Sequence, residues 1–192
     1  MMVRNSQRGR LVLIVGPSGV GKDTLIEYAR QALAGDANIR FVQRAITRPP
    51  SIGEDHTPMD EDRFERAAGQ GAFALHWAAH DMRYGLPVII DQWLAEGNVV
   101  IANGSRAMLG EARRRYPAVE IVSITAAPEV LAQRLAGRGR ETDEERRDRM
   151  ARYAAVSTNL GDVTIIDNSG EPEAAAARLI GMIKQLPSNG IK

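Results

Sequence analysis

A segment near the N-terminus, GPSGVGKDT at residues 16–24, constrains the fold of this 192-residue chain more than any other feature. It follows an apolar run typical of a buried strand, Leu11 to Val15, and it leads into a helical pattern from Gly21 to Leu33. Glycines let backbone N–H groups converge on a phosphate chain, and a helix N-terminus adds a partial positive charge. A strand, such a loop and a helix in this order predict a phosphate-binding loop in an α/β protein.

Each residue of this loop is a candidate contact for the phosphates of ATP, and Lys22 is expected to reach the β- and γ-phosphates. The candidate ATP-binding residues of the loop are Gly16, Pro17, Ser18, Gly19, Val20, Gly21, Lys22, Asp23 and Thr24. Asp23 stands where the motif usually has the serine or threonine that contacts Mg²⁺. Two interpretations are open: Asp23 contacts the metal, directly or through water, or it is a first-turn residue favoured by the helix dipole. Thr24 is the alternative metal contact.

Short apolar runs alternate with helical patterns along the rest of the chain, which predicts an α/β fold with a mainly parallel central sheet. Further strands are expected at 39–43, 73–77, 99–102, 119–124 and 163–166. Helices are expected from 86 to about 97, from 128 onward, at 141–157 and over the C-terminal apolar positions 179, 183 and 186. Residues 48–62 are rich in proline and polar side chains, so they are expected to form a loop or a mobile insert.

Charge and composition exclude several classes of protein. The chain has 25 basic and 24 acidic side chains and no cysteine. A near-neutral chain argues against a general nucleic-acid coat protein, and the absence of cysteine excludes disulfide scaffolds and thiolate zinc sites. No apolar run approaches the roughly 20 residues that span a bilayer, and residues 1–10 lack the apolar region of a secretory signal. We therefore expect a cytoplasmic protein with no nucleic-acid or membrane partner.

Seven arginines lie between residues 134 and 152, interleaved with acidic side chains. One interpretation is a solvated helix with ion pairs between successive turns, which we favour for Arg146 and Arg147. The other is a lid that closes arginines over the transferring phosphate, because a guanidinium binds phosphate oxygens with two parallel hydrogen bonds. Arg138 lies between two glycines, in a turn rather than on a helix face, which favours the lid for this residue.

An ordered set of motifs resembles the guanylate-kinase-like nucleoside monophosphate kinases. These motifs are GPSGVGKDT, Ile46-Thr47-Arg48, Tyr84-Gly85, RLAGRG at 134–139 and Arg149. The resemblance covers about residues 10–186 and implies a P-loop kinase with a three-layer α/β sandwich. It implies one domain at 10–187, with an acceptor-binding region at about 44–86, an arginine-rich lid at about 137–150, and flexible ends at 1–9 and 188–192.

The acceptor region departs from that group of kinases. Ser51 replaces an expected arginine, His56 stands near an expected tyrosine, and NGSR at 103–106 replaces an acidic motif. The combination of GKD, ITR, WxAH, YG and NGSR is similar instead to the ribose 1,5-bisphosphate phosphokinases of the same group. This resemblance implies ATP- and Mg²⁺-dependent phosphorylation of ribose 1,5-bisphosphate to 5-phospho-α-D-ribose 1-diphosphate, in phosphonate catabolism.

The resemblance also implies roles for individual residues. The catalytic residues would be Lys22, Arg138 and Arg149. The ATP site would include, besides the loop, Arg134, Arg138, Asp167 and Asn168. The acceptor site would include Arg48, His80, Tyr84, Asn103, Ser105, Arg106 and Arg149. Alternatives are a surface ion pair for Arg48, simple packing for Tyr84, and helix capping by Asn103 or Ser105.

Three other functions share parts of this pattern. A guanylate kinase or other nucleoside monophosphate kinase has the same donor site and lid, but Ser51 and the NGSR segment argue against it. A catalytically silent domain that binds protein partners would be expected to lack Lys22 or the lid arginines. A sugar- or shikimate-type kinase needs a base for a hydroxyl acceptor, and no carboxylate stands out for that role. A monomer and a homodimer are both compatible with the sequence.

Overall fold

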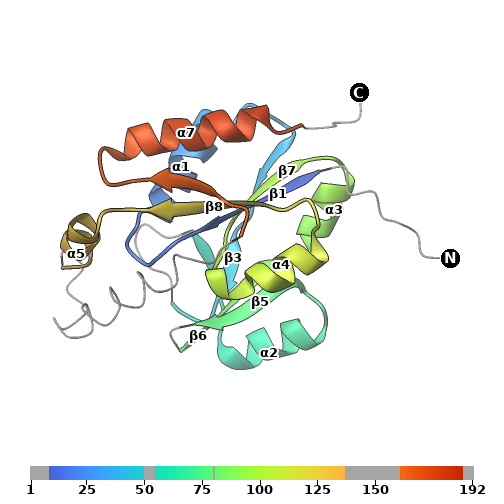
Figure 1. Ribbon diagram of the computed structural model, residues 1–192. Helices are drawn as coiled ribbons and strands as arrows, with labels where there is room; N and C mark the ends of the chain where they lie inside the picture. The colour runs from blue at the N-terminus through green and yellow to red at the C-terminus, as the bar shows by residue number, and fades with distance from the viewer. Residues whose placement is uncertain (1–8, 50–54, 80, 137–160, 188–192) are drawn as a thin grey trace.

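The computed structural model describes residues 9–49, 55–79, 81–136 and 161–187. A parallel five-stranded sheet forms the centre of the molecule (Figure 1). Its strands, in spatial order, are β2 (Ile39–Phe41), β7 (Val99–Asn103), β1 (Arg10–Val15), β8 (Glu120–Thr125) and β9 (Thr164–Asp167). Parallel strands need crossover connections, so helices come between them and cover both faces of the sheet.

The helices pack as two layers around this sheet. α1 (Lys22–Ala32) and α7 (Pro172–Gln185) lie together over one face (Figure 1). α3 (Ile89–Ala95) and α4 (Leu109–Arg115), with the short 3₁₀ helix η1 (Arg106–Met108), lie over the other face. α5 (Pro128–Ala136) follows β8 and begins with a proline in its first turn. No helix in the described part of the chain is long and apolar enough to cross a membrane.

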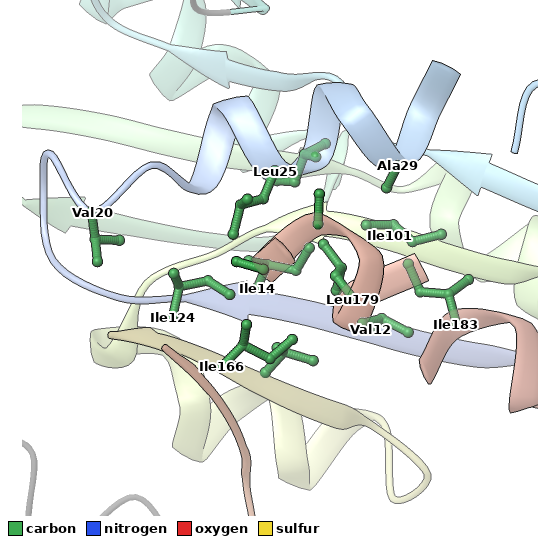
Figure 2. Close-up of a cluster of buried hydrophobic side chains, with 14 of the residues drawn as sticks. Val12, Ile14, Val20, Leu25, Ala29, Ile101, Ile124, Ile166, Leu179 and Ile183 are labelled. Atoms are coloured by element: carbon green, nitrogen blue, oxygen red, sulfur yellow. The ribbon is translucent and has the colours of Figure 1, made fainter. Parts of the chain in front are cut away.

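Strand β1 shows why the sheet is buried on both faces. Val12 and Ile14 pack into a core with α1 and α7, whereas Leu11 and Leu13 pack into a second core with α3 and α4. All four side chains are fully buried, as expected for the side-chain alternation of a central parallel strand. Figure 2 shows the first of these cores, in which Leu179 of α7 lies among the side chains of the sheet and of α1.

A second, four-stranded sheet lies beside the carboxyl ends of β1 and β7. Its spatial order is β4 (His56–Pro58), β3 (Arg44–Ile46), β6 (Met82–Pro87) and β5 (Phe73–Ala79). The β3–β4 pair is parallel and the other two pairs are antiparallel. Helix α2 (Glu61–Gly69) covers this sheet, and its fully buried Phe64 stacks on Phe73 with ring centroids 4.6 Å apart.

The structure confirms the predicted phosphate-loop strand and helix and the other predicted strands to within about two residues. Two predictions in the acceptor region are wrong. The helix expected from Leu86 begins only at Ile89, because Leu86 pairs with Leu75 as part of strand β6. The proline-rich segment expected as a loop contains β4 and the start of α2, because β4 pairs with β3.

Several predicted features lie outside the described residues or at their edge. The predicted helix at 141–157, the predicted lid at 137–150, Ser51 and the C-terminal tail all lie outside them. Gly9, the last residue of the segment expected to be flexible, is buried and its N–H donates to the Leu94 carbonyl at 2.9 Å.

Candidate active site

The predicted phosphate loop connects β1 to α1 at the carboxyl edge of the central sheet. Gly19 and Gly21 have φ values of +81° and +96°, in the region that only glycine adopts easily. Gly21 is the N-cap residue of α1, and a Cβ atom built on it would lie 2.5 Å from Nδ2 of Asn168. The loop therefore needs glycine at this position for both its backbone conformation and its packing.

Lys22 lies in the first turn of α1, and its ammonium group folds back over the loop. Nζ donates hydrogen bonds of 2.9 Å to the carbonyl oxygens of Gly16 and Pro17. An ammonium has three donors and no acceptor, so a group at this place suits phosphate oxygens as ligands. The charge is thus held beside the backbone amides that would surround a bound phosphate chain.

Two residues expected at the ATP site, Asn168 and Arg134, form hydrogen bonds that support the phosphate loop. Asn168 is 1% exposed, and its Nδ2 donates to the Val20 carbonyl at 2.8 Å. Arg134 donates to the carbonyl oxygens of Asn168 at 2.9 Å and of Val20 at 3.5 Å. Asp167 ends β9 with an exposed side chain, and it accepts a 2.6 Å hydrogen bond from the hydroxyl of Ser169. Asn168 and Arg134 therefore fix the shape of the loop.

Asp23 connects the loop helix to two other elements. Its Oδ1 accepts a 2.6 Å hydrogen bond from Nδ2 of Asn103 on β7 and forms a 3.5 Å ion pair with Arg44 on β3. The described contacts leave the second carboxylate oxygen, Oδ2, for another partner. Oδ1 of Asn103 is buried and has no hydrogen-bond partner among the described residues.

These oxygen atoms fit the chemistry of magnesium. Mg²⁺ prefers oxygen ligands and in kinases is held by one or two protein groups together with phosphates and water. Asp23 and Thr24 line the same cleft, and Asn103 lines the adjoining cavity. No group of three or more histidine, cysteine, aspartate or glutamate side chains that could hold a metal occurs in the described part of the chain. A metal here would depend on the nucleotide for most of its ligands.

An aromatic pair from the second sheet faces the loop. Trp77 on β5 and Tyr84 on β6 are cross-strand neighbours, and their rings stack at 5.3 Å with an interplanar angle of 5°. The Arg44 guanidinium carbon lies 5.7 Å from the centre of the Tyr84 ring, which is a cation–π distance. These contacts form a rigid wall opposite the phosphate loop.

One cleft joins these parts. Its lining residues come from the phosphate loop, the second sheet and the turn after β7; they are Gly16, Ser18, Gly19, Gly21, Lys22, Asp23, Thr24, Arg44, Arg48, Trp77, Ala79, Tyr84, Gly104 and Ser105. An adjoining cavity shares Asp23 and Arg44 with this cleft and also contacts Asn103. The carboxyl edge of a parallel sheet is the usual place for ligands in α/β proteins.

The predicted acceptor residues take different places around the cleft. Arg48, Tyr84 and Ser105 line it, and Asn103 lies behind Asp23. Ser105 also caps η1, because its Oγ accepts from the N–H of Ala107 at 3.3 Å. Arg106 is partly buried and does not belong to the cleft lining.

Three predicted site residues, His80, Arg138 and Arg149, lie outside the described residues. The structure also brings in four cleft residues that were not predicted for the site, namely Arg44, Trp77, Ala79 and Gly104. Trp77 and Gly104 belong to the WxAH and NGSR motifs, whereas Arg44 belongs to no motif. The position of Arg44 four residues before Arg48 was the one available signal.

Comparisons with known proteins bear on this site. A family model described as an AAA domain matches residues 12–154. A ribose 1,5-bisphosphate phosphokinase PhnN of Brucella melitensis is 50% identical over 186 residues, covering 96% of this chain and 97% of the relative. The PhnN protein of Thiobacillus denitrificans is 44% identical, covering 91% of this chain and 93% of the relative. The chain belongs to the PhnN family. It is therefore a member of a kinase family.

Solved structures of other kinases have a fold similar to that of this PhnN family member. A guanylate kinase from Anaplasma phagocytophilum is similar with a TM-score of 0.67 and 18% identity, covering 96% of this chain and 87% of that one. An unliganded sugar kinase from Janibacter has a TM-score of 0.54 and the same 18% identity. At this identity the likeness concerns the fold alone. It confirms the predicted α/β architecture with a mainly parallel sheet, like that of guanylate kinase.

Proposed function

We propose that this chain transfers the γ-phosphoryl group of ATP to the 1-phosphate of ribose 1,5-bisphosphate, giving ADP and 5-phospho-α-D-ribose 1-diphosphate. The observation that carries the proposal is the single cleft between the phosphate loop and the wall that holds Arg48 and Tyr84. A kinase for two anionic substrates needs a donor site and an acceptor site that open into one space. The names of the PhnN relatives support the choice of acceptor.

The proposed reaction requires little covalent chemistry from the protein. An oxygen of the 1-phosphate, already anionic at neutral pH, attacks the γ-phosphorus of ATP. The bond from that phosphorus to the β–γ bridging oxygen breaks, and the electron pair leaves with ADP. No general base is needed, so catalysis consists of positioning and of stabilising dispersed negative charge.

The donor half of the site would be the loop amides and Lys22. The ammonium group would exchange its two carbonyl contacts for phosphate oxygens as ATP binds. Mg²⁺ on the phosphate oxygens would neutralise part of their charge, with Asp23 or Thr24 as its protein contact. Asn168 and Arg134 would act by holding the loop, and Asp167 stays a proposed contact for the nucleotide.

The acceptor half would be built from Arg48, Tyr84 and Ser105, with Asn103 and Arg106 as proposed neighbours of the sugar. We further propose that Arg138 and Arg149 close over the transferring phosphate and that His80 faces the acceptor. One arginine of this kind contributes roughly 10³-fold or more in rate. A cytoplasmic location and a monomeric or homodimeric state also stay predictions.

A paired assay tests the proposal. Purified protein with ATP and Mg²⁺ receives ribose 1,5-bisphosphate in one reaction and GMP in the other, and phosphorus NMR follows the products. We expect a new sugar diphosphate signal and unchanged GMP, with the sugar product forming at least about 100-fold more slowly for Lys22→Met. Formation of GDP with an unchanged sugar would replace the proposal with guanylate kinase activity.

A further inference from the structure

Two arginines line the cleft in the described part of the chain, Arg44 and Arg48. Arg48 belongs to a motif, whereas Arg44, at the start of β3, belongs to none. Its side chain is 12% exposed and lines both the main cleft and the adjoining cavity. Arg48 lines the main cleft but not the adjoining cavity. Arg44 therefore stands at the end of the cleft, where the space continues into the cavity, and Arg48 stands on the wall of the cleft.

The present contacts of Arg44 orient its guanidinium but use little of its hydrogen-bonding capacity. Within the described residues it forms the 3.5 Å ion pair with Asp23 and lies over the face of Tyr84. A guanidinium carries five N–H donors in a planar fork that matches two oxygens of one phosphate. Contact with an aromatic face leaves the edge of that fork available to a ligand.

Arg30 makes a useful comparison because it has the same kinds of neighbours. It lies 5.5 Å from the Phe41 ring centre, and it forms ion pairs with Asp55 at 3.1 Å and Glu27 at 3.4 Å. It borders the adjoining cavity and does not line the main cleft. Two carboxylates engage Arg30, whereas one carboxylate shared with Asn103 engages Arg44.

The spacing of Arg44 and Arg48 suits a ligand with two phosphates. The two residues are four positions apart, on β3 and just after its end. Strand β3 ends at Ile46, and Arg48 lies in the bend that follows it. An arginine on the strand and an arginine beyond its end can reach different parts of the cleft and need not compete for one phosphate.

From this geometry we propose that Arg44 binds the 5-phosphate of the acceptor, the one that does not react, while Arg48 and Tyr84 hold the 1-phosphate near the loop. The inference rests on the proposed function and extends it by naming the residue that selects a bisphosphorylated pentose. Asp23 acts as a positioning residue, because its Oδ1 holds the guanidinium at the end of the cleft before the acceptor binds.

A pair of acceptors tests this role directly. Ribose 1-phosphate has the reacting phosphate of ribose 1,5-bisphosphate and lacks the 5-phosphate. Steady-state kinetics with both sugars are measured for the wild-type protein, Arg44→Gln and the matched control Arg30→Gln. We expect Arg44→Gln to lower kcat/KM for the bisphosphate by about 10- to 100-fold, the range of a charge-assisted hydrogen bond.

The decisive quantity is the ratio of kcat/KM between the two sugars. We expect the wild-type protein and Arg30→Gln to prefer the bisphosphate strongly, and Arg44→Gln to lose most of that preference through a higher KM. The KM for ATP, measured separately, is expected to change less than threefold. Arg44→Lys is expected to recover part of the preference, because it restores the charge without the fork.

Other outcomes overturn the inference. An Arg44→Gln protein that loses activity equally on both sugars would show that Arg44 acts on the reacting phosphate or on the fold. A preference lost in Arg106→Ala and kept in Arg44→Gln would move the 5-phosphate site to Arg106. A wild-type protein that leaves both sugars unchanged would refute the proposed function, and this inference with it.

Discussion

The side-chain amide of Asn168 donates a hydrogen bond of 2.8 Å to the carbonyl oxygen of Val20, although 148 positions separate the two residues. Val20 belongs to the phosphate loop, and Asn168 directly follows β9 at the edge of the central sheet. This contact joins the edge strand to the loop, and the buried amide fills the space that Gly21 leaves open. The shape of the loop thus depends on a residue from the far end of the chain.

Asn168→Ala is expected to weaken ATP binding and to lower stability. The substitution removes the amide from the Val20 carbonyl, and a lost buried hydrogen bond costs about 1–3 kcal/mol. We expect a KM for ATP raised about 3- to 10-fold and a lower melting temperature, with a smaller change in the KM of the acceptor. Thermal unfolding and steady-state kinetics measure both effects. An unchanged KM for ATP would show that the loop holds its shape without Asn168.

Gly21→Ala is expected to distort the phosphate loop, because Gly21 packs against the side chain of Asn168. A left-handed conformation at φ +96° costs a non-glycine residue about 1–2 kcal/mol, and the new methyl group would collide with Asn168. We expect lower stability and at least 10-fold weaker binding of a non-hydrolysable ATP analogue. Gly181→Ala in α7 is the control, because a Cβ there meets no atom within 4 Å and helix stability should rise. Equal behaviour of the two variants would contradict this prediction.

Lys22→Met is expected to abolish most phosphoryl transfer while the protein stays folded. Loss of one preorganised charged donor at a transition state costs about 10²–10³-fold in kcat. The carbonyl oxygens of Gly16 and Pro17 lose an ammonium that is only partly buried, so water can replace it. Single-turnover kinetics give the rate, and circular dichroism checks the fold. A kcat within 5-fold of the wild-type value would remove Lys22 from the catalytic residues.

The sequence predicts the central sheet and the loop well because their signals are local. Strand β1 is a continuous apolar run, and the loop glycines follow it directly. The helix expected from Leu86 fails for a non-local reason. Leu86, Ile89 and Ile90 have helical spacing, but pairing with β5 takes Leu86 into β6. Val88 lies between the end of β6 and the start of α3, and its N–H donates to the Ala72 carbonyl instead of to a helical partner.

The candidate site is predictable only where a motif marks it. Arg48 and Tyr84 belong to short motifs and line the cleft as expected. Arg44 has no motif, and its relation to Asp23 arises from the placement of β3 beside the first turn of α1. Asn168 was expected near the nucleotide, but its burial behind the loop depends on how β9 lies next to β8.

Tyr84 carries two separable roles, and two substitutions distinguish them. Tyr84→Phe keeps the stack on Trp77 and the contact with Arg44 but removes the hydroxyl. We expect a KM for the acceptor raised about 3- to 10-fold, the range for one neutral hydrogen bond. The melting temperature should change little, since the contact of the hydroxyl with Sδ of Met82 is a long one of 4.0 Å. Tyr84→Ala also removes the stack on Trp77. It is expected to lower the free energy of unfolding by about 0.5–1.5 kcal/mol more than Tyr84→Phe does. A Phe variant with wild-type kinetics would assign Tyr84 to packing alone.

Tyr28 and Glu173 connect the two helices on one face of the sheet, and their contact predicts a pH dependence. The Tyr28 hydroxyl donates a 2.7 Å hydrogen bond to Oε1 of Glu173, joining α1 to α7. This hydrogen bond lowers the pKa of Glu173 from its ordinary value of 4.5. It also raises the pKa of Tyr28 above 10.0, with a further contribution from the charge of Glu173.

The signs of the two shifts define a pH window for this contact. The lowered pKa of Glu173 means that its contribution to stability is present above pH 4.5 and is lost as the pH falls through the folded-state pKa. The raised pKa of Tyr28 means that its contribution is present below pH 10.0 and is lost as the pH rises through the folded-state pKa. Tyr28→Phe should therefore lower the melting temperature at pH 7, and by less as the pH falls below 4.5 through the folded-state pKa of Glu173. A difference in melting temperature that stays constant as the pH falls would show that the contribution of Tyr28 does not depend on the charge of Glu173.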